Sequence, residues 1–274
     1  MVQVLVIYKK VVKERIVVLE KQQIKQYWFV IRELTGRELK RKYSRSYLGV
    51  VWSVLNPLLS MAVMSAVFST MFQRSIENFP IYFLTGNIIW QLFTSATNTS
   101  MTSLVDNKQL LIKVKIPLQV FTLSRVYTAF ANFLYSFVAY IVLLAVFQIK
   151  PNWSMLVIIP VVVLALLFAI GLSLFLSVVY VFFGDIKYLY GIVLTLWMYL
   201  SAIFYPVTSL SETMKGIVSA NPMYAYISAA RGCMMYGEIP SMQLWIQMIA
   251  WAVIVFLLGH FFFQSKRNQI MQKV

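Results

Sequence analysis

The chain has 274 residues, of which 60% are hydrophobic and 12% charged, and its mean hydropathy is +0.75. Soluble domains are about half apolar and one quarter charged, so a soluble fold of this size has too little core to bury so much apolar surface. We therefore expect lipid to surround much of the chain. The net charge of +15 would suggest nucleic acid in a soluble protein. In a membrane protein it reflects cytoplasmic Lys and Arg, so we expect no nucleic-acid partner.

Six stretches without Asp, Glu, Lys or Arg divide the chain, and each is long enough to cross a hydrocarbon layer of roughly 30 Å. These stretches are residues 46–73, 78–105, 126–149, 151–184, 188–211 and 239–265. We expect an all-α integral membrane protein with six transmembrane helices. The charge map gives a cytoplasmic N-terminal segment at 1–45, a transmembrane domain at 46–265 and a cytoplasmic tail at 266–274.

A seventh uncharged stretch, residues 216–230, has only 15 residues and contains Asn221-Pro222. It is too short to span a bilayer. We interpret it as a re-entrant or interfacial helical pair between the fifth and sixth spans, since non-helical backbone is tolerated where protein buries it. The segment around it, residues 205–232, is suited to capping an exit, or it is an ordinary outer loop; composition does not separate the two.

Lys and Arg predict the orientation. Residues 1–45 carry twelve of the 24, and placing them in the cytoplasm puts 20 inside and four outside: Arg74, Lys150, Lys215 and Arg231. The reverse topology inverts this ratio, so both termini are expected in the cytoplasm.

The N-terminal segment contains an amphipathic helix. Ile24, Tyr27, Trp28, Ile31 and Leu34 share one helical face, and Gly36 is expected to end the helix. An aromatic face just before a span indicates a helix lying in the membrane interface, with Tyr27, Trp28 and Ile31 in contact with lipid. The alternative is a soluble helix packed on a partner.

The sequence offers no catalytic centre. It has no P-loop, no HExxH motif and no paired carboxylates in a span, and Cys233 and His260 are its only Cys and His, so we expect neither catalysis nor a metal site. Energy for transport must then come from outside the chain. The cytoplasmic loop 106–121 mixes apolar and basic residues and is predicted to dock on another protein through Leu110, Leu111, Ile112, Lys113, Lys115 and Pro117. The alternative is an ordinary basic loop.

Aromatic residues make up 16% of the chain and suit a carbohydrate conduit, because sugars stack on aromatic faces. The aromatic candidates are Trp52, Trp90, Tyr199, Tyr205, Trp245 and Trp251. Asn56, followed by Pro57, adds a hydrogen-bonding group early in the first span, where Pro57 can bend the helix. The alternative is that the aromatics form an interfacial belt and that Pro57 is only a packing kink.

The order of the segments resembles the permease subunits of ABC-2-type polysaccharide exporters, which export O-antigen, teichoic acid, capsule or rhamnan chains. The resemblance covers nearly the whole chain. It rests on RSYLGVVWSVLNPLL (45–59), NKQLLIKVKIPLQVF (107–121), GDIKYLYG (184–191), Tyr205-Pro206 and NPMYAYISAARG (221–232).

This resemblance implies a homodimer in a bacterial cytoplasmic membrane, each copy paired with a separate subunit that binds ATP and Mg²⁺. It implies that 106–121 is a coupling helix, that 21–34 is an interface helix and that two short outer gate helices precede the last span. The substrate would be a glycan on an undecaprenyl-type lipid. One alternative is an ABC-2 permease that exports a small lipophile or drug. A second, from another class, is a membrane-embedded transferase acting on lipid-linked sugars, but Asp106 and Asp185 are too few to supply its catalytic base or metal-binding acids.

Overall fold

The computed structural model describes residues 25–44, 46–72, 76, 78–113 and 116–273, and within these ranges it is helical and contains no strand. An N-terminal helix covers residues 25–43. It is followed by α2 (Val51–Phe72), α3 (Phe79–Met101), α4 (Ser103–Asp106), α5 (Lys108–Lys113), α6 (Gln119–Val146), η1 (Trp153–Val157), α7 (Ile158–Phe182), α8 (Ile186–Leu200), η2 (Val207–Ser209), α9 (Glu212–Ala220), α10 (Pro222–Arg231), η3 (Gly232–Tyr236) and α11 (Met242–Lys273).

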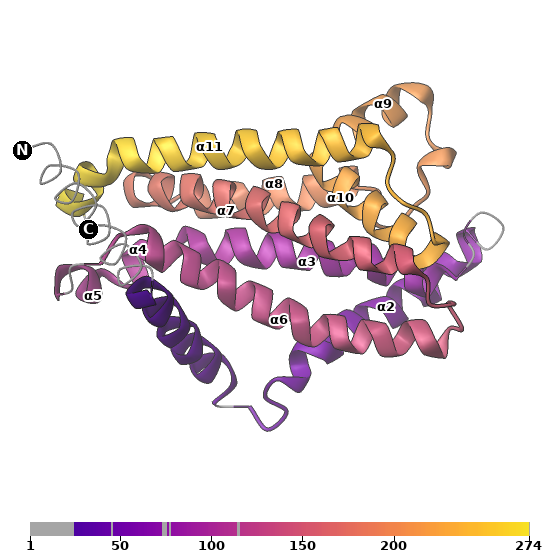
Figure 1. The fold of residues 1–274 in the computed structure, drawn as a ribbon, viewed down its shortest axis with the longest axis horizontal. Helices are drawn as coiled ribbons and strands as arrows, with labels where there is room; N and C mark the ends of the chain where they lie inside the picture. Colours follow the sequence, from indigo (N-terminus) through magenta and orange to yellow (C-terminus); the bar gives the residue numbers. More distant parts are fainter. Residues whose placement is uncertain (1–24, 45, 73–75, 77, 114–115, 274) are drawn as a thin grey trace, which may run out of the picture.

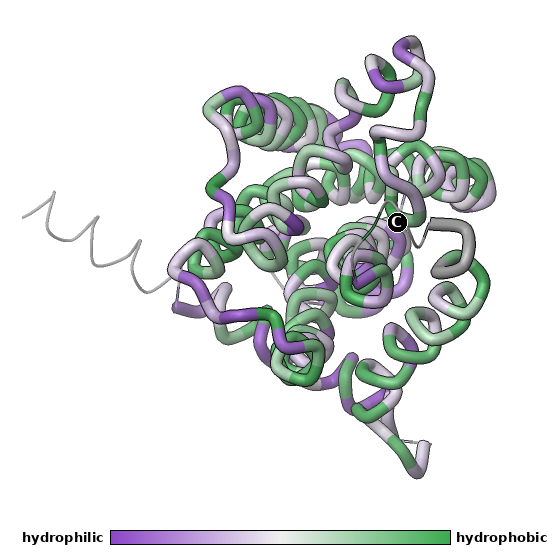
Figure 2. Tube along the Cα trace, turned by 90° about the vertical axis from the view of Figure 1, so that its right-hand side faces the viewer, coloured by the Kyte–Doolittle hydropathy of each residue, from purple (hydrophilic) through white to green (hydrophobic). Residues whose placement is uncertain are grey.

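Six of these helices, α2, α3, α6, α7, α8 and α11, lie on the six uncharged stretches in the same order. They form one bundle in which successive long helices run in alternating directions along a common axis, with α2 inclined to the others (Figure 1). Figure 2 looks along this bundle and shows hydrophobic residues on every long helix. The all-helical fold class predicted from the sequence is therefore confirmed.

Four helical segments are long and apolar enough to cross a membrane: 51–68, 119–146, 153–182 and 242–273. The helix α3 does not meet this standard because it carries Thr, Asn, Gln and Ser side chains. Most of its residues are buried among other helices. The apolar helix α8 has only 15 residues.

The bundle is organised around α3, which contacts α2, α6, α7 and α10. Two buried side-chain hydrogen bonds tie α3 to its neighbours. Thr85 Oγ1 and Tyr140 OH of α6 lie 2.7 Å apart, and Tyr190 OH of α8 donates to Thr97 Oγ1 over 2.7 Å. Such bonds hold membrane helices together where lipid removes the hydrophobic driving force between them.

The helices α7 and α11 form the most extensive contact between two helices. Two glycines determine how closely these helices approach each other. A Cβ added to Gly259 would lie 2.0 Å from the carbonyl oxygen of Gly171, and one added to Gly171 would lie 2.5 Å from the backbone of Phe256. Small residues at such a crossing let two membrane helices approach backbone to backbone.

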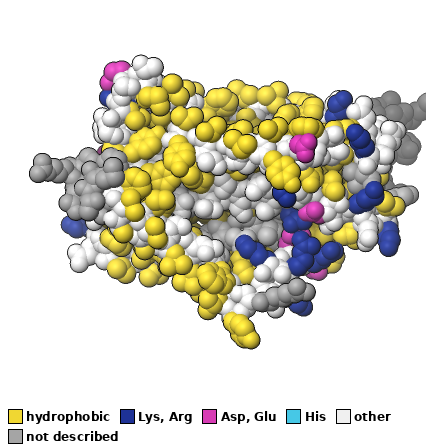
Figure 3. All heavy atoms as spheres, turned by 180° about the vertical axis from the view of Figure 1, so that it is seen from behind, with side chains coloured by type: hydrophobic (Ala, Val, Ile, Leu, Met, Phe, Trp, Pro, Cys, Tyr) yellow, Lys and Arg dark blue, Asp and Glu magenta, His cyan; other side chains and the backbone are white. Residues whose placement is uncertain are grey.

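The two ends of the bundle differ in charge. The C-terminal end of α11, the α4–α5 loop and the N-terminal helix lie at one end, and α9 lies at the other (Figure 1). Seen from behind, Lys and Arg gather at the first end (Figure 3). We call it the basic end. The segments predicted to share the cytoplasmic side of the membrane therefore share one end of the molecule.

One helix boundary differs from the sequence expectation. Gly36 does not end the N-terminal helix, which continues to residue 43. The backbone of Gly36 is not left-handed, so it does not form a glycine C-cap. Contacts of Thr35, Glu38 and Tyr43 with α6 hold the continued helix in place.

Candidate functional site

The N-terminal helix packs across α6. Trp28 meets Tyr127 edge to face with ring centroids 5.1 Å apart, and Thr35 Oγ1 donates to the carbonyl of Ser124 over 3.1 Å. Tyr27 and Ile31 are half-buried, whereas Trp28 remains 50% exposed. One face of the helix thus contacts the bundle and part of its aromatic surface stays open. The lipid contact predicted for these residues stays a prediction.

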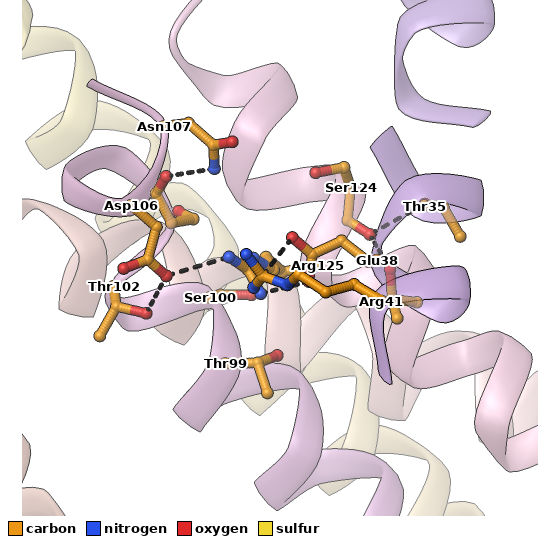
Figure 4. A network of polar contacts seen from close by, with 12 residues as sticks. Thr35, Glu38, Arg41, Thr99, Ser100, Thr102, Asp106, Asn107, Ser124 and Arg125 are labelled. Atoms are coloured by element: carbon orange, nitrogen blue, oxygen red, sulfur yellow. Dashed lines mark hydrogen bonds and ion pairs between the residues drawn. The ribbon is translucent and has the colours of Figure 1, made fainter. Parts of the chain in front are cut away.

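Arg125 joins the N-terminal helix to the α4–α5 loop (Figure 4). Its side chain is buried on α6 and donates from Nη1 to Glu38 Oε2 of the N-terminal helix and from Nη2 to Asp106 Oδ2 of α4 over 3.0 Å. Glu38 also pairs with Arg41 at 3.8 Å, and Thr102 donates to Asp106 over 2.8 Å. One guanidinium therefore connects the predicted interface helix with the predicted coupling loop.

A polar cavity lies next to this network, among α2, α3 and α6. Asn56 lines it together with Lys42, Gln91, Asn132 and Ser136. Tyr43 OH donates to Asn132 Oδ1 over 2.7 Å, which fixes the end of the N-terminal helix at the cavity wall. Of the residues predicted for the conduit, only Asn56 lines this cavity.

Pro57 has a structural consequence at the same place. A proline has no N–H, so the carbonyl of the residue four positions earlier, Ser53, lacks its helical partner. Ser136 of α6 supplies one, with Oγ 2.6 Å from the Ser53 oxygen. A side-chain bond from α6 therefore replaces the missing backbone hydrogen bond of α2 at the cavity wall.

The other predicted conduit residues lie apart. Trp52 is 41% exposed on α2, and Trp90 is 4% exposed in the core, with its ring 5.8 Å from Phe93. Tyr199 and Tyr205 lie together at the end of α8, where Tyr205 OH donates to the Tyr199 carbonyl. The monomer does not gather these residues into one channel, and their shared role stays a prediction.

The residues predicted for coupling divide into two groups. Leu111 is 5% exposed and packs in an apolar cluster with Leu104, Leu118, Phe121, Phe263 and Ile270. Ile112 is 69% exposed, Lys113 is exposed, and Leu110 and Pro117 are half-buried. Lys115 lies outside the described residues. Leu111 thus anchors α5 to its own chain, and Ile112 is the apolar side chain that α5 presents outward.

The opposite end contains the expected pair of short helices. Asn221 caps α10, with its Oδ1 accepting from Met223 N over 2.9 Å and from Trp197 Nε1 of α8 over 2.7 Å. Seven residues of α10 are buried, so this helix re-enters the bundle, while α9 is largely exposed. The helical pair predicted from the short uncharged stretch is confirmed, and its gating role stays a prediction.

Arg231, expected as an outer loop charge, is instead buried at the end of α10. It donates from Nε to the carbonyl of Tyr82 and from Nη1 and Nη2 to those of Ala202 and Ile203 over 2.9 Å each. This arginine holds the non-helical segment after α8 against α3. A Cβ on Gly86 would lie 2.7 Å from its Nη2, so Gly86 makes room for the guanidinium.

The described residues include no cluster of three or more His, Cys, Asp or Glu side chains that could hold a metal. The arrangement offers a polar cavity beside Asn56, the charge network of Arg125 and the surface helix α5. These features suit the binding of a ligand and of a partner protein.

The profile of the ABC-2 type transporter family matches residues 30–235. This chain belongs to the ABC-2 type transporter family. The match begins within the N-terminal helix and ends within η3, and it confirms the resemblance drawn from the order of the sequence segments.

Named relatives of this ABC-2 chain include export permeases. The O-antigen export system permease protein RfbA of Myxococcus xanthus is 28% identical over 92% of this chain and 98% of its own length. Its namesake from Klebsiella pneumoniae is 30% identical over 75% of this chain and 80% of its own length. The polysialic acid transport protein KpsM of Escherichia coli is 22% identical over 76% and 82%.

Sequence reasoning missed two arginines of this ABC-2 chain. Arg125 and Arg231 were counted as loop charges for topology, yet both are buried. A signal existed for Arg125, because its acidic partners, Glu38 and Asp106, stand among basic residues in segments predicted on the same side of the membrane. For Arg231 there was none, because its partners are backbone carbonyls.

Proposed function

We propose that the chain is the transmembrane permease subunit of an ATP-driven exporter that moves lipid-linked polysaccharide across the cytoplasmic membrane of a bacterium. The observation that carries this proposal is the similarity to an O-antigen export permease along 98% of that protein's length. The weaker similarity to a polysialic acid transport protein extends it to capsule-type polymers. The lining beside Asn56 and Gln91, which offers amides, hydroxyls and the single cation of Lys42, suits a glycan, which needs many hydrogen bonds.

Six helices cross the membrane in this proposal, and both chain termini are cytoplasmic. The 20-to-four division of Lys and Arg supports it, as does the gathering of basic residues at one end of the bundle. In a cysteine-free background, cysteines at Lys113 and Ser211 should react with impermeant reagents from opposite sides of the membrane. Reaction of both from outside the cell would refute the orientation.

The energy comes from a separate ATPase subunit that binds ATP and Mg²⁺. Two exposed residues of α5, Ile112 and Lys113, are suited to meet it, since an apolar side chain beside a cation fits a cleft with an acidic rim. Two copies of the chain form the permease. None of the α2 span 51–68 is buried, and α8 buries only Tyr190, so each helix keeps an exposed face on which a second copy can pack.

A small lipophile is the second candidate substrate. A cavity of about 650 Å³ near the end of α6 and the start of α7 is lined by Phe137, Ile141, Leu144 and Ile159 and suits an apolar molecule. Its volume is within the usual range for drug-sized ligands.

Deletion of the gene decides between a polysaccharide and a small lipophile as the substrate. Loss of surface polysaccharide with accumulation of its lipid-linked precursor supports the glycan exporter. Intact polysaccharide together with new sensitivity to drugs would refute it in favour of the lipophile. Copurification from mild detergent should in either case recover an ATPase.

A further inference from the structure

Two cavities adjoin the loop between α6 and η1. The apolar cavity, of about 650 Å³, contains Ile141 and Ile159. The loop cavity, of about 520 Å³, contains Asn152 and Tyr236. Residues 148–151 line both, so the two cavities are continuous. The loop lies at the end of the bundle that carries α9, opposite the basic end (Figure 1).

The apolar cavity has the environment and the length that suit an acyl chain. Ile141 and Ile159 are 50% and 61% exposed, so this side of the cavity opens to the hydrocarbon of a surrounding bilayer. Its wall on α6 runs from Phe137 to Gln148. Eleven residues of helix cover about 16 Å, which is about the depth of one hydrocarbon leaflet.

The loop cavity lies at the level of the headgroups. Trp153 and Tyr236 are 85% and 52% exposed on η1 and η3, and these two segments are joined by Ser154 Oγ, which donates to the carbonyl of Cys233 over 3.0 Å. Exposed Trp and Tyr side chains are typical of the boundary between membrane and water. The apolar cavity therefore extends into the membrane from a polar rim at its surface.

Lys150 is the only charged residue among the described residues that line the two cavities. Cations on the predicted outer side run against the usual bias of membrane proteins. Two of the four expected there have partners, since Arg231 binds backbone carbonyls and Lys215 pairs with Glu212 over 2.7 Å. Arg74 lies outside the described residues. Lys150 forms no ion pair with any described carboxylate, and its place on both cavities favours an anionic ligand.

Gln148 stands beside this lysine in a strained conformation. Its φ is 57°, its N–H donates to the carbonyl of Ala145 over 3.1 Å, and Ile149 N donates to that of Leu144 over 2.9 Å. This helix ending usually has Gly or Asn at the left-handed position, because the conformation costs free energy for other residues. A glutamine here costs stability and places a side-chain amide on the wall shared by both cavities, which indicates a binding role.

We propose that the two cavities bind one anionic phospholipid of the bilayer, of the phosphatidylglycerol type. One acyl chain lies in the apolar cavity, and the phosphodiester oxygens accept hydrogen bonds from the Lys150 ammonium and the Gln148 amide. Bonds from an ammonium to a phosphate are charge-assisted and therefore stronger than those from neutral donors. The lipid is a resident of the site and is not transported, so the inference goes beyond the proposed function and does not depend on the exported molecule.

The test measures lipid binding to the permease–ATPase complex in detergent. Dioleoyl phosphatidylglycerol and dioleoyl phosphatidylcholine carry the same acyl chains and are added separately. Native mass spectrometry measures how much of each lipid stays bound, and the melting temperature reports the stabilisation that binding gives. The wild-type complex should bind phosphatidylglycerol about tenfold more tightly, in line with one charge-assisted hydrogen bond.

The headgroup contact is tested at Lys150. Lys150→Gln should remove the preference for phosphatidylglycerol, and Lys150→Arg should preserve it. Lys215→Gln is the matched control, because it removes another cation of the predicted outer side that lines neither cavity. The difference between the two Gln variants isolates this site from other lipid contacts of the complex.

The acyl-chain contact is tested at Ala145, which lines the apolar cavity. Ala145→Phe should fill part of the cavity and weaken both lipids several-fold. Val146→Phe is the control, because Val146 is the next residue, is 67% exposed and does not line the cavity.

The strained glutamine gives a readout that a purely structural residue would not. Gln148→Gly should raise the melting temperature without added lipid, because glycine adopts the left-handed conformation without strain. The same variant should weaken phosphatidylglycerol several-fold relative to phosphatidylcholine.

Three results would overturn the lipid site: no preference for phosphatidylglycerol in the wild-type complex, the same preference in Lys150→Gln and Lys215→Gln, or the same binding by Ala145→Phe and Val146→Phe. Deletion of the gene tests the proposed function separately, since surface polysaccharide is its readout. Failure of the lipid site therefore leaves the exporter standing, and failure of the exporter leaves the lipid site standing.

Discussion

Arg231 stacks on Tyr82, with its guanidinium carbon 3.4 Å from the ring centroid, while its Nε donates to the carbonyl of the same residue over 3.2 Å. The stack and the bonds to Ala202 and Ile203 join α10, α3 and the segment after α8 at one point. Ala202 has a φ of 49°, a conformation that costs free energy for a non-glycine residue, and the bond to Arg231 holds its carbonyl in that geometry.

We expect Arg231→Met to destabilise the folded chain by about 3–5 kcal/mol, because three buried carbonyls lose a charged donor. Arg231→Lys should restore part of the loss, since an ammonium donates but does not form the flat stack. The measurement is the melting temperature of the detergent-solubilised protein, with size-exclusion chromatography as the readout of the protein that remains folded. Arg267→Met, at an exposed position on α11, is the matched control. Equal melting temperatures for the two Met variants would contradict the prediction.

The crossing of α7 and α11 gives a second prediction. Gly259→Val should cost about 3 kcal/mol or more, because its Cβ meets the Gly171 carbonyl and backbone cannot yield as a side chain does. Gly216→Ala in α9, where nothing lies within 4 Å of the added Cβ, should be neutral or slightly stabilising. The yield of monodisperse protein and its melting temperature distinguish the two variants. A folded Gly259→Val variant of wild-type stability would show that the helices do not cross here.

A third prediction concerns the bond between Glu38 and Arg125. Glu38→Gln removes the charge that holds the N-terminal helix on α6, so this helix should detach more often. The measurement is alkylation of a cysteine at Thr35, which is 4% exposed, in a Cys233→Ala background. Its rate should rise about tenfold, in line with the loss of one charge-assisted hydrogen bond. Glu33→Gln, an exposed position on the same helix, should leave the rate unchanged, and equal rates in both variants would refute the link.

The sequence predicted the helices well and their contacts poorly. Uncharged stretches identify membrane helices because charge is costly in hydrocarbon, and each stretch holds a long helix of the bundle. Asn221-Pro222 marked the junction of α9 and α10 because Asn caps a helix and Pro begins one.

Tertiary packing decides what the sequence pattern could not. Trp90 and Trp52 look alike as aromatic residues in spans, yet one is in the core and the other is open, because α3 is surrounded by helices and α2 is not. Leu111 and Ile112 are adjacent and equally apolar, and only the direction of each side chain on a helix of six residues separates them.

That difference on α5 gives a fourth prediction. Leu111→Asp should destabilise the permease itself by several kcal/mol, because it buries an unpaired charge in the apolar cluster around Leu104 and Phe263. Ile112→Asp should leave the melting temperature unchanged and reduce copurification of the ATPase, since its side chain is 69% exposed. Ile112→Leu is the control that keeps the apolar contact. Normal ATPase binding by Ile112→Asp would show that α5 is not the docking element.

The aromatic conduit gives the last prediction, and the structure makes it sharper. Trp52 on α2 and Tyr199 on α8 are 41% and 57% exposed, so replacing either with Leu removes an aromatic surface without opening a core cavity. If sugars slide along these faces, both variants should export less surface polysaccharide while the melting temperature and ATPase pairing stay at wild-type values.

Trp90→Leu should instead lower stability by about 2 kcal/mol, because Trp90 is 4% exposed and packs on Phe93. Trp153→Leu, at a position 85% exposed on η1, tests the interfacial belt and should affect neither stability nor export. Normal export by both the Trp52 and Tyr199 variants would assign these aromatics to the lipid boundary and leave the polar cavity beside Asn56 as the remaining candidate for sugar contact in the described part of the chain.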